Sequence, residues 1–447
     1  MARERALQPL LLCWQGRWAG LGGGPLAWRL NGLAGLVLMA LLAGLPLVTR
    51  QGLALLMLAS AVLWALMALT QPPHPAQAVG RWLLLLLAVA VVATGFSPVP
   101  AAALEGLIKL ISFLLCFALM RELLWREPPW WDRLVAALLG GALLNGVVAI
   151  RQLYMPLEEL ARWADPNSVS AGTVRLYGTL GNPNLLAGSL VPILPLAVVA
   201  ALRWRSPWSR LFAVVTAAIG GTALVLTYSR GGWIGLMASL AALVLLLALR
   251  AARHLPPLWR RLLPVLLLIG GSLATVVLVA SVEPLRIRAT SLMAGRGDSS
   301  NNFRINVWLA ALAMVRDRPW IGIGPGNEAF NLIYPLYQQP RFDALSAYSV
   351  PLELLVEGGV PMLMSAVGLL VATTGRALRQ LRGEARVALP CIGALAAIAG
   401  LVGHGLGDTV FFRPEVQLVG WFSLATIASL PASGGGADRQ LPAEEPA

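Results

Sequence analysis

Apolar and polar residues occur in long blocks along this chain. Mostly apolar runs recur from residue 31 onward, and the connectors between them carry arginine, proline or glycine. A run of roughly 20 such residues forms a helix long enough to cross about 30 Å of hydrocarbon. The pattern predicts twelve membrane-spanning helices, at residues 31–48, 52–70, 81–97, 102–121, 133–153, 184–202, 210–227, 231–249, 262–281, 349–373, 387–405 and 414–430. We therefore expect an all-α polytopic membrane protein.

The composition supports this fold class. The chain has 447 residues, of which 57% are hydrophobic and 12% are charged. Soluble domains carry about 25% charged residues. We expect one transmembrane domain over residues 31–430, a cytoplasmic N-terminal tail at 1–30 and a disordered cytoplasmic tail at 431–447.

Arginine is distributed unevenly among the connectors. With the N-terminus in the cytoplasm, twenty arginines fall on the cytoplasmic side, whereas the short outer connectors carry only Arg50, Arg230 and Arg413. This bias follows the positive-inside rule and predicts that both termini face the cytoplasm. The other ten arginines lie in two longer periplasmic segments, 151–183 and 282–348, where topology does not require them.

The net charge and the cysteines indicate neither a nucleic-acid site nor a metal site. A formal net charge of +13 in a soluble protein would suggest nucleic acid. Here the topology and contact with anionic membrane lipid account for it, so no nucleic-acid partner is expected. Cys13, Cys116 and Cys391 are far apart and form no Cys/His cluster. The sequence therefore predicts no metal and no cofactor.

The longest polar stretch, the periplasmic loop 282–348, separates the ninth and tenth predicted helices. Within it, residues 303–315 place apolar side chains at helical spacing and include Arg304, which predicts an amphipathic helix at the membrane surface. The glycine-rich stretch 322–326 follows no strand, so a dinucleotide site is not expected. We interpret it as a tight turn that returns the chain over the helices.

Two shorter periplasmic motifs also carry arginine. Arg175 precedes an Asn182-Pro183-Asn184 turn, where Asn184 is a candidate cap for the next helix. Such a helix start offers unpaired N–H groups to an anion, although an ordinary capped helix would give the same pattern. Arg230 lies in a tight turn, and either contacts lipid head groups or faces a cavity.

Two carboxylates are expected near the start of the tenth helix. Glu353 and Glu357 are four residues apart and share one helix face. Carboxylates in a membrane span are costly, so each requires a partner, and Arg230 or Arg304 are the candidates. A structural ion pair and a catalytic role remain alternatives.

A histidine and an aspartate have the same spacing near the end of the eleventh helix. His404 and Asp408 are the pair, and His404 is the one histidine placed for chemistry on the periplasmic side, because His74 and His254 fall in cytoplasmic connectors. A packing histidine bonded to Asp408 is the alternative interpretation.

Taken in order, these motifs resemble the O-antigen ligase/polymerase superfamily over about residues 175–370. The resemblance lies in Arg175, Gly178-Thr179, Asn182-Pro183-Asn184, Tyr228-Ser229-Arg230-Gly231, Arg304, Trp308, Pro319, Gly322, Gly324 and Glu357-Gly358. The stretches 345–353 and 404–414 further resemble a cyanobacterial branch of that superfamily described as bicarbonate transporters.

The resemblance implies a metal-independent glycosyltransferase. Such enzymes move a glycan from an undecaprenyl-pyrophosphate carrier to a glycan or lipid acceptor on the periplasmic side. It implies that Arg175, Arg230 and Arg304 bind the pyrophosphate, since one guanidinium group can donate two parallel hydrogen bonds to phosphate oxygens. The remaining candidates are Glu353, His404 and Tyr348 as catalytic residues, and Asn182, Asn184, Glu357, Asp408 and Arg413 in support.

One position departs from the ligases, which carry a histidine just before the tenth helix. This chain has Tyr348 there, and a phenol with a pKa of about 10 is a weak general base at neutral pH. Glu353 or His404 are the candidates to replace that base.

Two other functions remain open from the sequence. One is a bicarbonate transporter, in which the arginines attract a small anion to a site at the membrane midplane. The other is an accessory protein whose loop docks a partner through aromatic side chains.

Overall fold

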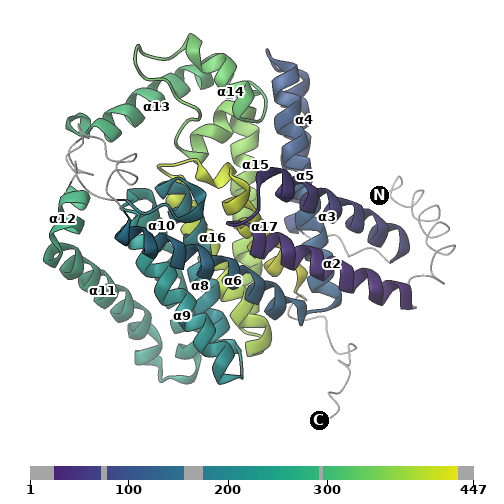
Figure 1. Cartoon of the computed structure of the whole chain (residues 1–447), viewed down its shortest axis with the longest axis vertical. Coiled ribbons are helices and arrows are strands. Elements are labelled where there is room, and N and C mark those ends of the chain that lie inside the picture. The colour runs from purple at the N-terminus through teal and green to yellow at the C-terminus, as the bar shows by residue number, and fades with distance from the viewer. Residues whose placement is uncertain (1–24, 72–77, 156–174, 291–294, 431–447) are drawn as a thin grey trace.

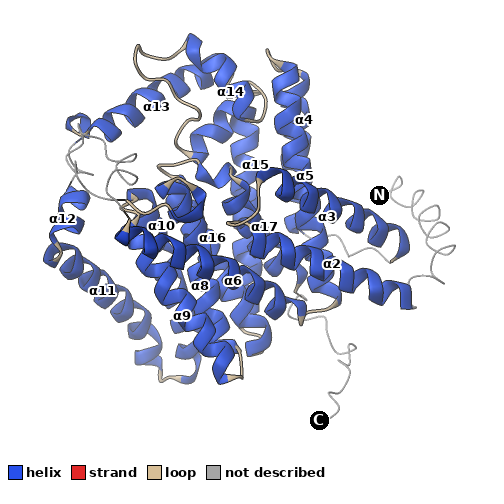
Figure 2. Cartoon of the chain, in the orientation of Figure 1, coloured by secondary structure: helices blue, strands red, loops and turns tan. Residues whose placement is uncertain are grey.

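The computed structural model describes residues 25–71, 78–155, 175–290 and 295–430. These residues form helices joined by short loops, and no strand occurs among them (Figure 2). The all-helical fold class predicted from the sequence is confirmed. The predicted tail at 431–447 and most of the predicted tail at 1–30 lie outside the described residues.

The predicted spans correspond to twelve helices. They are α2 (Pro25–Gly44), α3 (Arg50–Thr70), α4 (Ala78–Gly95), α5 (Pro100–Arg126), α6 (Trp130–Arg151), α8 (Pro183–Arg203), α9 (Pro207–Leu226), α10 (Arg230–Ala251), α11 (Pro257–Ser281), α15 (Val350–Gln380), α16 (Ala385–Gly405) and α17 (Pro414–Ser429). Eleven helices in the described part of the chain are long and apolar enough to cross a membrane. The predicted twelfth span is α17, which has only 16 residues.

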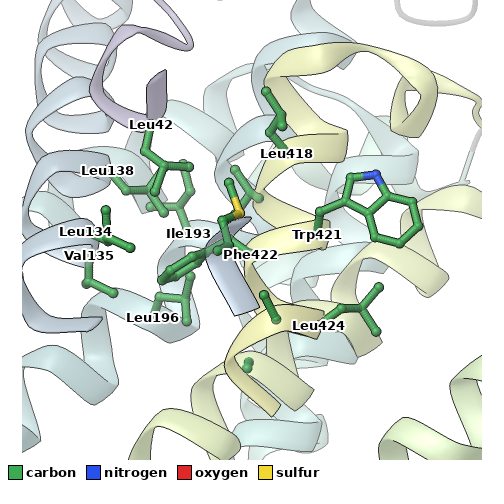
Figure 3. Packing of buried hydrophobic residues seen from close by; sticks show 14 of the residues in the cluster. Leu42, Leu134, Val135, Leu138, Ile193, Leu196, Leu418, Trp421, Phe422 and Leu424 are labelled. Carbon is green, nitrogen blue, oxygen red and sulfur yellow. The ribbon is translucent and has the colours of Figure 1, made fainter. Parts of the chain in front are cut away.

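The centre of the bundle differs from its periphery. Helix α8 is 83% buried and α16 is 67% buried, whereas α11 at the left edge of Figure 1 is 6% buried. Every residue of α17 from Val416 to Ser429 is buried against its neighbours. Figure 3 shows Phe422 of α17 packed among Leu138, Ile193 and Leu196. A helix enclosed by other helices need not match the full hydrocarbon thickness, which suits the short α17.

Residues 295–348 pack onto one end of the bundle, which we call the loop side, and they contain α13 (Ser299–Asp317) and α14 (Asn327–Ile333). Helix α12 (Glu283–Thr290) lies beside the end of α11. Helix α13 covers the range 303–315, where a helix was predicted, and it buries Val307, Ala311 and Met314 in a cluster with other loop residues.

The glycine-rich turn at 322–326 fits into a break in α15. Gly358 and Gly359 leave the helical conformation, and the freed backbone bonds to the turn: Ile323 N donates to Val356 O at 2.9 Å and Gly324 N to Glu357 O at 2.9 Å. Gly322, Gly324 and Gly326 all have positive φ, which agrees with the predicted tight turn. Broken helices are tolerated in membranes where other backbone groups satisfy the freed ones.

Candidate functional site

A polar hollow of about 490 Å³ lies on the loop side. It is formed by the start of α13, the start of α8 and the turn that precedes α15. Its lining residues are Asn184, Ser299, Ser300, Asn302, Phe303, Arg304, Arg341, Phe342 and Tyr348. Two guanidinium groups, several hydroxyl and amide groups and three aromatic rings therefore face one space, which we call the Arg304 hollow.

Among the described residues, Arg304 makes only long polar contacts. Its Nη2 lies 3.6 Å from Asp408 Oδ2, and its Nη1 lies 3.5 Å from Ser300 Oγ. Its side chain is 18% exposed, and its Nε is buried without a hydrogen-bond partner among the described residues. A cation so weakly bound within the protein retains most of its capacity to bind an anion.

Arg230 is bound far more tightly, and it does not line the hollow. Its Nη2 donates to Asp298 Oδ1 at 2.7 Å and its Nη1 to Asn301 Oδ1 at 2.5 Å. Asp298 is fully buried and caps α13 by accepting from Asn301 N at 3.1 Å. The guanidinium of Arg230 therefore fixes the first turn of α13, one turn before Arg304.

Arg175 reaches the hollow through Asn184. Its Nη2 donates to Asn184 Oδ1 at 2.7 Å, and Asn184 Nδ2 donates to Asp408 Oδ2 at 3.1 Å. The same Asp408 oxygen faces Arg304. Arg175 Nε donates to Thr227 O at 2.9 Å, next to the turn before Arg230. A chain of polar contacts thus joins Arg175 to Arg304 through one amide and one carboxylate.

The start of α8 is fixed differently from the prediction. Asn182, and not Asn184, caps the helix: its Oδ1 accepts from Asn184 N at 2.8 Å and from Leu185 N at 3.3 Å. Pro183 occupies the first helical position, where no N–H is needed, so the cap lies one residue before it. This arrangement leaves the Asn184 side chain available for Arg175 and Asp408.

Asn145 of α6 and Gln152, the residue directly after α6, hold the segment before α8 in place. Gln152 Oε1 accepts from Tyr177 N and Gly178 N, both at 3.0 Å, and Asn145 Oδ1 accepts from Thr179 N at 2.9 Å. Both side chains are buried. The position of Arg175 therefore depends on polar side chains inside the bundle.

Tyr348 lines the hollow in a left-handed conformation, with a φ of 49°. Its ring meets the Phe303 ring edge-on, with centroids 5.3 Å apart. Burial raises the pKa of Tyr348, and the negative charge of Asp408 raises it further. The phenol is therefore protonated at neutral pH, and it can donate a hydrogen bond but not act as a general base.

The two carboxylates of α15 do not pair with the expected arginines. Glu353 Oε2 accepts from Ala347 N at 2.6 Å, and Glu357 Oε1 accepts from Gly326 N at 2.7 Å. Backbone N–H groups of the loop reach them because the chain folds back over the start of α15. Both side chains are buried, and neither lines the Arg304 hollow. They therefore hold the loop against the helix.

The alternative of a packing histidine bonded to Asp408 is wrong, because no hydrogen bond or ion pair among the described residues joins His404 to Asp408. Helix α16 ends at Gly405, so helical spacing does not extend to Asp408. Asp408 Oδ1 instead accepts from Thr409 N at 2.8 Å and from Val410 N at 3.2 Å. His404 is 2% exposed, lies close to glycines of α8 and α10, and has no hydrogen-bond partner for Nε2 among the described residues.

His404 is also absent from the lining of the hollow, as is Arg413. Arg413 is exposed at the first position before α17.

Several lining residues were not predicted from the sequence. Arg341 is a second cation there, and its φ of 73° is a consequence of the loop fold that no local motif indicates. The polar run 299–302 just before the amphipathic helix was the available signal for the hydroxyl and amide groups. No group of three or more His, Cys, Asp or Glu side chains that could hold a metal occurs in the described ranges.

In a comparison with known protein families, residues 212–367 match the O-antigen ligase family. The matched segment runs from α9 to the middle of α15, and therefore includes Arg230, Arg304 and Tyr348 but not Arg175 or His404. No curated protein matches the chain. The match supports the ligase-like superfamily, and it does not support the transporter alternative.

Proposed function

We propose that this protein is an O-antigen ligase-like glycosyltransferase of the bacterial inner membrane. It transfers a glycan from an undecaprenyl-pyrophosphate carrier to a glycan or lipid acceptor on the periplasmic side, without a metal. The observation that carries the proposal is the Arg304 hollow, in which two guanidinium groups lie beside hydroxyl, amide and aromatic groups, within a segment that matches the ligase family.

In this reaction an acceptor hydroxyl attacks the anomeric carbon of the glycan. The bond between that carbon and the pyrophosphate oxygen breaks, and negative charge develops on the leaving pyrophosphate. Arg304 and Arg341 supply positive charge to that group. Positive groups that are already positioned beside the leaving pyrophosphate stabilise the transition state, in which its negative charge develops. Arg175 and Arg230 act one step away: Arg175 orients Asn184 and Asp408, and Arg230 fixes the start of α13.

The aromatic rings of the hollow and Asp408 have the remaining roles. The rings of Phe303, Phe342 and Tyr348 offer an apolar face to a sugar, and the protonated Tyr348 hydroxyl donates a hydrogen bond. The acceptor must lose one proton. Asp408 is the base we assign, because its Oδ2 lies 3.6 Å from Arg304 Nη2 and 3.1 Å from Asn184 Nδ2, and both of these residues line the hollow.

The test is transfer by the purified protein in liposomes that contain an undecaprenyl-pyrophosphate-linked glycan and a lipid-linked acceptor. Arg304→Ala should lower the rate of transfer by about 10²- to 10³-fold, the usual effect of removing one such charge. Arg316→Ala is the matched control, because Arg316 is an exposed arginine on the same helix that does not line the hollow. Equal loss of activity in both variants, or full activity in Arg304→Ala, would contradict the proposal.

A further inference from the structure

A second hollow lies between the spanning helices α5, α15, α16 and α17. Its volume is about 360 Å³, near the lower end of the roughly 300–1,000 Å³ typical of small-molecule sites. Its walls are almost entirely apolar and include Phe113, Leu370 and Leu424. Pro325 and Gly326, in the turn on the loop side, also line it. We call it the apolar groove, and it shares no lining residue with the Arg304 hollow.

One cation lies in the wall of this groove. Lys109, the only lysine of the chain, is the tenth residue of α5. At 1.5 Å per residue it is about 14 Å along the helix from Pro100, well inside the hydrocarbon region. Its side chain is exposed and lines the groove. Cations in spanning helices are costly and usually have an anionic partner.

The ion pairs among the described residues do not include Lys109. The charges that act on it belong to Arg413, Glu357, Glu415 and Arg50. Of these, Glu357 also lines the groove, but its Oε1 accepts from Gly326 N at 2.7 Å. The carboxylate therefore attracts the ammonium group from a distance while it is bonded to the turn. The ammonium group keeps its N–H donors for a ligand in the groove.

A second donor in the same wall has no acceptor. Trp421 of α17 lines the groove and is 5% exposed, and its Nε1 is buried without a hydrogen-bond partner among the described residues. Figure 3 shows its indole directed away from the packed cluster around Phe422. Buried indole N–H groups usually have an acceptor. An apolar groove with an uncompensated cation and an unpaired donor is complementary to an amphiphile with an acceptor-rich head group.

We propose that the apolar groove binds one hydrocarbon chain of a phospholipid and that Lys109 binds its phosphate. Lysine extends its long apolar stem so that its charge approaches the interface, which brings the ammonium group toward a phosphate at the loop side. The bound chain lies against the turn at 325–326, and so supports the same backbone that Glu357 holds. This lipid site is separate from the proposed site of glycan transfer, and its test does not depend on transfer activity.

The test is native mass spectrometry of the purified full-length protein with added phosphatidylglycerol. Diacylglycerol serves as a probe with the same chains and no phosphate. The wild type should retain one phosphatidylglycerol and should not retain diacylglycerol. Lys109→Met should weaken retention about five- to tenfold, whereas Lys109→Arg should preserve it.

A second variant tests the groove independently of the charge. Ala366→Trp places a large ring in the groove and should abolish retention. Val371→Trp is its control, because Val371 is 66% exposed on the same helix and does not line the groove. Retention unchanged in both Lys109→Met and Ala366→Trp, or equal retention of diacylglycerol, would overturn the proposal. Displacement of phosphatidylglycerol by one equivalent of undecaprenyl phosphate would also overturn it, because the groove would then belong to the carrier.

Discussion

Two consecutive turns at the start of α13 each contain an arginine guanidinium, but one guanidinium is tightly bound by the protein and the other is loosely bound. In the first turn, Asp298 and Asn301 bind the guanidinium of Arg230 at 2.7 and 2.5 Å, and that arginine is 5% exposed. In the next turn, Arg304 has contacts of 3.5 and 3.6 Å and faces a hollow. A guanidinium bound at short range to a buried carboxylate stabilises structure, and one bound at long range beside a cavity is available for a ligand.

The largest expected effect separates the two arginines. Arg304→Ala should reduce glycan transfer by about 10²- to 10³-fold and leave the thermal unfolding midpoint nearly unchanged. Transfer rate and unfolding midpoint, measured on the same detergent-purified sample, check this. If Arg304→Ala lowers the unfolding midpoint as much as a substitution at Arg230 does, Arg304 also stabilises the fold, and the contrast between the two arginines is wrong.

Arg230 should behave in the opposite way. Arg230→Met leaves Asp298 buried without its cation, which costs about 3–5 kcal/mol of unfolding free energy. The double variant Arg230→Met/Asp298→Asn removes both charges, and asparagine still caps a helix. We expect it to recover most of the lost stability in thermal unfolding. A double variant no more stable than Arg230→Met would show that the ion pair does not account for the loss.

The amide between Arg175 and Asp408 should have an intermediate effect. Asn184→Ala removes the partner of Arg175 Nη2 and of Asp408 Oδ2, at a cost of about 1–3 kcal/mol. We expect transfer to fall about tenfold, because Asp408 loses its alignment with Arg304. Asn182→Ala is the comparison: it should lose about 1 kcal/mol of stability through the helix cap and retain its transfer rate relative to folded protein.

The smallest effect concerns pH. Burial raises the pKa of Tyr348 above its ordinary value, so the protonated phenol favours the folded state. This contribution is fully present below about pH 10 and is lost as the pH rises through the folded-state pKa. Tyr348→Phe should therefore lose less stability than the wild type as the pH rises above about 10.

The control for this measurement is Tyr154→Phe, because Tyr154 is 88% exposed. Thermal unfolding of the three proteins across this pH range would check the prediction. An identical alkaline loss in the wild type and Tyr348→Phe would contradict it.

Local patterns in the sequence were sufficient for the helices and for part of the loop. Span length and apolar content do not depend on neighbours, so the predicted range 52–70 corresponds to Arg50–Thr70 and 387–405 to Ala385–Gly405. The amphipathic spacing around Arg304 likewise predicted α13. The short α17 was predicted as a full span because its sequence does not show that other helices enclose it.

The candidate site could be predicted only in part. Arg304 and Tyr348 line the hollow as the motifs suggested, and Asn184 does so in a different role from the predicted cap. Arg341 was not singled out, and Glu353, His404 and Arg413 lie outside the lining. His404 and Asp408 show the reason: their spacing implies one helix face only if the helix continues, and α16 ends at Gly405.

The sequence by itself determined the order of the apolar helices, the helix around Arg304 and the concentration of arginines in the two longer loops. These follow from residue type and periodicity, which act over a few turns of chain. Only the tertiary structure decided which arginine is bound and which remains available. Asp298 reaches Arg230 across 68 residues and Asp408 reaches Arg304 across about 100, and contacts at such separations arise from packing and not from local pattern.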